Sequence, residues 1–94
     1  MVKGVILVDL TDQGRRGIKE SPNRAEASKA TALKLGVHVR DLFYTPGGPH
    51  DAALVIEAEG PDSIHKFMWS EQSSGNVKMK FVRTFSIEEM RKMV

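Results

Sequence analysis

The sequence predicts a single α+β domain with the element order β-α-β-β-α-β and a short helix at its end. Three observations predict it. Four stretches rich in β-branched and other apolar residues have the length of strands, two segments between them open with helix-start signals, and 94 residues are enough for one domain. We therefore treat residues 1–94 as one unit.

The first third of the chain is expected to form a strand, a loop and a helix. Residues 2–10 are apolar on both alternating faces, which is typical of a strand covered on two sides. Two glycines and several polar residues predict a loop over residues 11–17, with one helical turn after it. A helix is expected from Ser21, which can cap it, and Pro22, which suits the first helical position; it ends at Gly36.

The middle of the chain is expected to contain two strands joined by a turn. Residues 37–44 form the second predicted strand, and residues 51–58 form the third, which is again apolar on both faces. Between them, residues 45–50 are dense in proline and glycine and predict a turn.

The last third is expected to contain a helix, a strand and a short helix. Apolar residues at helical spacing predict a helix over residues 62–73, and clean alternation predicts a strand over residues 77–85. Ser86 and Glu89 fit a capping box, which predicts a final helix that continues through Met93.

This order of elements is the split βαβ arrangement of ferredoxin-like domains, with the first and third strands in the centre of a four-stranded antiparallel sheet. Right-handed crossovers place both helices on one face of that sheet. Both alternating faces of the central strands carry large aliphatic side chains: Val5 and Leu7 alternate with Ile6 and Val8, and Val55 alternates with Leu54 and Ile56. The uncovered face is therefore apolar, as interaction surfaces often are.

A second copy of the same sheet is the simplest cover for that face, because two-fold homodimers are the commonest oligomers. We therefore expect a homodimer or a higher even oligomer. A chain this short leaves little room for a deep cleft within one subunit, so a sizeable cavity is expected between subunits.

Composition excludes several classes of function. The 14 basic and 12 acidic residues leave a formal net charge of only +2, which does not indicate a nucleic-acid partner. RNA-recognition domains share the element order, but residues 51–58 lack the aromatic side chains on which bases stack. There is no cysteine, so disulfides, thiolate nucleophiles and cysteine-based metal sites are excluded.

The chain also lacks signals for a membrane or for secretion. Its longest apolar run, residues 5–8, is far too short to cross a bilayer. The first residues enter a strand-like pattern directly and do not resemble a signal peptide. We therefore expect a cytoplasmic protein without a membrane partner.

Four groups of residues carry a resemblance to a known family. They are residues 11–16 with 18–22 and Arg24, Tyr44 with residues 48–51, residues 57–58 with 61–62, and residues 75–77 with 83–86 and Glu89. They look like the loop into the first helix, the naming Gly-Tyr-Asp motif, the strand-to-helix junction and the capped last strand of the GYD-domain proteins. These are small bacterial and archaeal proteins of unassigned function. The resemblance covers almost the whole chain.

The resemblance implies a dimeric α/β barrel, in which two ferredoxin-like sheets face each other. It implies no activity and no cofactor. His50 stands where the naming motif has its tyrosine, so a role of that phenol is not carried over to this chain.

His50 and Asp51 are the candidate catalytic residues, because a histidine beside a carboxylate can act as a general base or bind a ligand. Adjacent residues of a strand point to opposite faces, however. The alternative is that Asp51 bonds backbone N–H groups of the proline- and glycine-rich turn, while His50 lies at the surface.

Four further residues complete the candidate ligand-binding set. Arg15 and Arg16 can bind a carboxylate or a phosphate, or can be a solvated loop tip that pairs with nearby acids. Tyr44 precedes the turn, and Trp69 shares a helix face with His65; the alternative for this tryptophan is half-burial against a neighbouring element. The three histidines are scattered, so no metal site is expected.

Two functions of different class follow. In the first, a homodimer holds a small apolar or amphipathic ligand between its facing sheets. In the second, the protein is a cofactor-free enzyme of the dimeric α/β-barrel type, similar to an oxygenase or isomerase, and uses His50 and Asp51. The second requires polar residues that converge on the space between the sheets, and the candidates are Asp9, Tyr44, His50 and Asp51.

Overall fold

The four strands form one antiparallel sheet in the order β2-β3-β1-β4, and the computed structural model of the protein describes residues 1–94. The strands are β1 (Val2–Leu10), β2 (Val37–Tyr44), β3 (Ala52–Ala58) and β4 (Val77–Arg83). The first and third strands are central and the second and fourth are edges, so the predicted ferredoxin-like sheet is confirmed.

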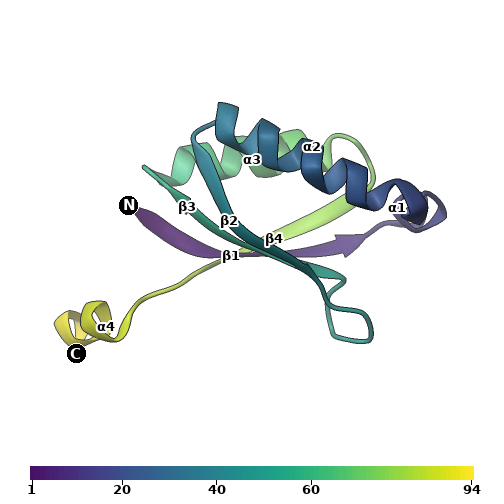
Figure 1. The fold of residues 1–94 in the computed structure, drawn as a ribbon. Helices are drawn as coiled ribbons and strands as arrows, with labels where there is room; N and C mark the ends of the chain where they lie inside the picture. Colours follow the sequence, from purple (N-terminus) through teal and green to yellow (C-terminus); the bar gives the residue numbers. More distant parts are fainter.

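Two helices cover one face of this sheet (Figure 1), as the crossover rule predicts: α2 (Ser21–Lys34) and α3 (Pro61–Gln72). The helix α2 stops before Gly36, whose φ of 86° suits glycine and ends the helix. The core lies between the helices and the sheet, and its largest fully buried side chains are those of Ile6, Val37, Ile56, Ile64 and Phe67.

The predicted loop over residues 11–17 contains a short helix instead. The helix α1 spans Asp12–Arg16, and the hydroxyl of Thr11 caps it by accepting a bond from the N–H of Gly14 at 3.1 Å. The helical turn expected after residue 17 is confirmed: it is a 3₁₀ turn, η1 (Ile18–Glu20), which leads directly into α2.

The expected capping role of Ser21 is wrong, because η1 has already brought the chain into helical conformation. Ser21 has φ −56° and ψ −44°, whereas a capping residue has extended backbone angles. Ser21 is the first residue of α2, and its hydroxyl lies 2.9 Å from the phenol oxygen of Tyr44. Two strand boundaries also differ from the prediction: β3 begins one residue later than predicted, and β4 ends two residues earlier.

The sheet face away from α2 and α3 is apolar at its centre. It presents Val5 and Leu7 of β1 with their cross-strand partners and neighbours Phe43, Ala53, Val55 and Val82. We call these six residues the open sheet face. Phe43 and Val82 are 46% and 49% exposed, so the face has no cover within the chain.

The helix α4 (Ile87–Met93) projects away from the body of the molecule (Figure 1). It begins with the predicted capping box: the Ser86 hydroxyl accepts from the N–H of Glu89 at 3.0 Å, and the Glu89 carboxylate accepts from the N–H of Ser86 at 3.1 Å. None of its residues is buried, and Ile87, Met90 and Met93 are exposed.

Candidate functional site

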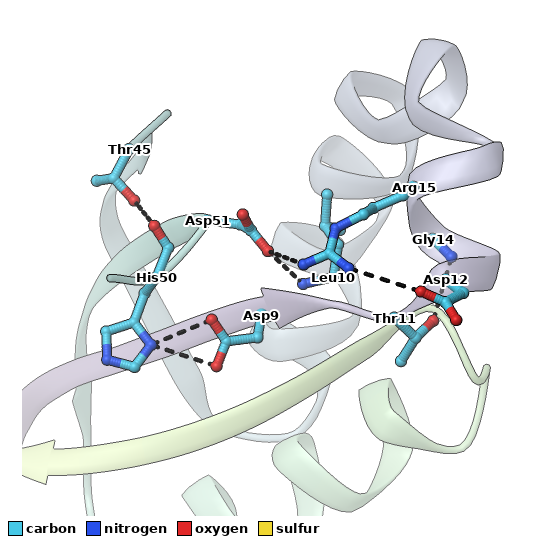
Figure 2. Close-up of polar contacts among 9 residues, drawn as sticks. All are labelled: Asp9, Leu10, Thr11, Asp12, Gly14, Arg15, Thr45, His50 and Asp51. Atoms are coloured by element: carbon cyan, nitrogen blue, oxygen red, sulfur yellow. Dashed lines mark hydrogen bonds and ion pairs between the residues drawn. The ribbon is translucent and has the colours of Figure 1, made fainter. Parts of the chain in front are cut away.

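A polar cluster gathers where β1 ends and where the turn between β2 and β3 leads into β3 (Figure 2). The His50 Nδ1 lies 3.1 and 3.2 Å from the two carboxylate oxygens of Asp9. The side chains of His50 and Asp9 are 25% and 37% exposed, so the pair is accessible from solvent without being fully hydrated.

The turn that holds His50 is fixed by its own backbone and by β1. Thr45, at the start of the turn, holds the backbone of His50, because the Thr45 hydroxyl donates a hydrogen bond to the His50 carbonyl at 2.5 Å. Gly47 has a φ of 82° in the middle of the turn, which favours glycine. At the end of the turn, the N–H of Asp51 donates to the carbonyl of Val8 at 2.9 Å, so the turn is seated on β1 beside Asp9.

Asp51 points away from His50, as strand alternation predicts for neighbours. Its carboxylate accepts a bond from the N–H of Leu10 at 2.8 Å and lies 3.7 Å from the guanidinium of Arg15 (Figure 2). Asp51 therefore bonds a backbone N–H, but that N–H belongs to β1 and not to the turn. His50 and Asp51 do not pair with each other, and His50 pairs with Asp9.

Tyr44 lies on the helix side of the sheet, where its phenol meets Ser21 of α2. Tyr44 and Asp51 both line a cavity of about 70 Å³ between α2, the end of α3 and the sheet. The four residues expected around one space are thus divided: Asp9 and His50 lie at the edge of the open sheet face, and Tyr44 and Asp51 lie beneath α2.

Arg16 and Trp69 join neither group. Arg16 is exposed on α1 and takes part in no ion pair, whereas its neighbour Arg15 lies between Asp12 and Asp51. Trp69 is 75% exposed on α3, so the expected half-burial against a neighbouring element is wrong. Its helical position is turned away from the sheet, and no other element of the chain covers it there.

Sequence reasoning named Asp9 as a candidate for the space between the sheets but did not pair it with His50. It missed two residues of the cavity. Arg24 and Glu71, which also line the cavity, gave no signal, because charged residues at helix positions are usually solvated.

The arrangement at Asp9 and His50 can hold and transfer a proton. A carboxylate that accepts a hydrogen bond from Nδ1–H orients the imidazole, and the unprotonated Nε2 can then accept a proton. Nowhere in the chain do three or more histidine or carboxylate side chains gather as metal ligands. None of the helices is long and apolar enough to cross a membrane.

Comparison with known proteins identifies a family whose model matches this chain. The model of the family described as the GYD domain matches residues 5–94. No curated protein and no solved structure matches the chain.

Proposed function

This chain belongs to the GYD domain family, and we propose that it functions as a homodimer that binds a small amphipathic molecule between two facing sheets. One observation carries the proposal: the open sheet face is apolar at its centre and has the Asp9–His50 pair at its edge. Exposed apolar surface of this kind is removed from water when a second copy covers it.

The charges around the open sheet face fit a second copy. Lys78 and Lys80 project on this side from the edge strand β4, since they pair with Asp9 and Leu7 of β1. Asp41 projects on the same side from the opposite edge strand β2, since it pairs with Val55. A two-fold axis parallel to the strands lays β4 of one copy over β2 of the other, so that lysine faces aspartate across the interface.

The ligand class follows from the same surface. Apolar side chains would contact the body of the molecule, and the imidazole of His50, held by Asp9, would bond its polar end. An amphipathic molecule binds more tightly for two reasons: its apolar body is removed from water, and its polar end makes a hydrogen bond.

A second candidate function rests on the 3.1 Å contact between His50 Nδ1 and Asp9. It fits a cofactor-free enzyme in which His50 is the general base and Asp9 orients it, so Asp9 takes the role that was expected for Asp51. Under this alternative, His50→Gln and Asp9→Asn both lower the rate but leave ligand binding measurable.

The dimer is tested by size-exclusion chromatography with light scattering on the wild type and three variants. We expect twice the mass of one chain for the wild type and a monomer for Val55→Glu and Val82→Lys, which place charges on the open sheet face. Leu33→Glu is the control, because Leu33 is an exposed apolar residue of α2, away from the open sheet face. A wild-type monomer, or a dimer that persists in both face variants, contradicts the proposal.

The ligand is tested by native mass spectrometry of the freshly purified protein. A bound mass that is retained by the wild type, released on denaturation and lost in His50→Gln supports binding at this edge. A retained mass that is unaffected by His50→Gln and by both face variants places the ligand elsewhere and overturns this part of the proposal.

A further inference from the structure

The cavity beneath α2 lies on the opposite side of the sheet from the open sheet face and within a single subunit. Its floor is made by apolar side chains of the strands, among them Val8, Leu54 and Met79. Its roof is made by Ser21, Ala25 and Ser28, which share one face of α2 at a spacing of one and two turns. These side chains are too small to fill the space between helix and sheet.

Two opposite charges line this cavity, and neither has a charged partner. The guanidinium of Arg24 donates to the carbonyls of Gly17 at 2.9 Å and Gly14 at 3.4 Å. The carboxylate of Glu71 accepts a bond from the hydroxyl of Ser28. None of the ion pairs of the structure includes Arg24 or Glu71.

Both side chains are partly buried, and a charge that is removed from water without an opposite charge is costly. A molecule that carries both a carboxylate and an ammonium group supplies the missing partner to each. Its apolar part then lies on the floor of the strands, where water would gain few hydrogen bonds.

We propose that this cavity binds a small zwitterion, an α-amino acid with a short apolar side chain. Arg24 binds its carboxylate and Glu71 binds its ammonium group, and the hydroxyl-bearing residues Ser28 and Tyr44 also line the cavity. The cavity of about 70 Å³ is less than half the size of the roughly 150 Å³ apolar cavity that binds benzene, so the side chain of the ligand must be short.

The site is tested by NMR titration of the full chain with L-alanine, n-propylamine and propionate. The last two each carry one of the two charges. We expect saturable shifts of the amides around Ser28 and Tyr44 with L-alanine, and binding about tenfold weaker or worse with either half-ligand, because a charge-assisted hydrogen bond is lost. L-leucine is expected to cause no shift at these amides.

Variants assign each charge separately. Arg24→Gln is expected to weaken L-alanine and propionate but not n-propylamine, and Glu71→Gln to weaken L-alanine and n-propylamine but not propionate. Ala25→Leu, which fills the cavity from α2, is expected to abolish all three. The controls are Arg91→Gln and Glu88→Gln, which remove the same charges from an exposed ion pair of α4.

The outcomes separate this site from the dimer. If L-alanine binds no better than its half-ligands, or if shifts fall only on the open sheet face, the zwitterion site is wrong. Because Val55→Glu does not touch the cavity, binding of L-alanine by that variant as a monomer supports the site even where the proposed dimer fails.

Discussion

Asp51 joins three elements through one residue. Its carboxylate accepts the N–H of Leu10 and approaches Arg15 of α1, its own N–H donates to the carbonyl of Val8, and its carbonyl accepts the N–H of Thr45. The turn before β3, the end of β1 and α1 therefore depend on the same side chain and its backbone.

Asp51→Ala is expected to lower the free energy of unfolding by about 1–3 kcal/mol, because the N–H of Leu10 loses its acceptor in a partly buried position. Asp51→Asn retains an oxygen acceptor and is expected to lose less than Asp51→Ala, since the Arg15 pair is largely exposed and contributes little. Urea denaturation measures both. Equal losses in the two variants would show that the carboxylate charge, and not the backbone bond, matters.

At the residue scale, the sequence predicted the kinds of residues in the site better than their partners. Strand alternation predicted that His50 and Asp51 diverge, and they do. The partner of His50 is Asp9, 41 residues earlier, and only the register of β1 and β3 brings the two together. The predicted half-burial of Trp69 was wrong for a related reason, because spacing within a helix does not show which elements lie beside that helix.

Elements were predicted well where the signal is local. The capping box of α4 lies within four residues, and the glycine that ends α2 acts on the last turn alone. Ser21 does not act as the cap because the helical turn η1, which was expected after the loop, runs directly into α2 and sets helical angles before Ser21. The cavity beneath α2 could not be predicted, because it depends on the distance between α2 and the sheet, which no local signal sets.

The cap of α4 makes a prediction about pH. Hydrogen bonds from the backbone and hydroxyl of Ser86 lower the pKa of Glu89 below its ordinary value of 4.5. A carboxyl with a lowered pKa in the folded state stabilises that state fully above its unfolded value, and the stabilisation is lost as the pH falls through the folded value. We therefore expect α4 to be intact at neutral pH and to fray below about pH 4.5.

This titration can be followed by NMR through the amide of Ser86, which donates to the Glu89 carboxylate. In Glu89→Gln the side-chain oxygen still accepts this bond but does not titrate, so the amide of Ser86 is expected to stay constant over the same range of pH. A pH-dependent shift of equal size in that variant would assign the change to another group.

At the scale of the whole molecule, the sheet depends on β4 for its stability but does not depend on α4. A chain that ends at Phe85 is expected to retain the sheet and its unfolding midpoint, because α4 buries no residue. A chain that ends at Asn76 is expected not to fold, because β4 pairs with β1 from Gly4 to Leu10. Circular dichroism and thermal unfolding distinguish the two; cooperative melting of the shorter chain would contradict this reading of the sheet.

The sheet order β2-β3-β1-β4 determines how long each strand waits for its neighbours during translation. The central strand β1 is translated before either of its neighbours, β3 and β4, exists. At about 5–20 residues per second, β1 waits several seconds for β4, with apolar side chains on both of its faces unpaired. Of the four strands, the one in the middle of the finished sheet thus stays open to a chaperone for the longest time.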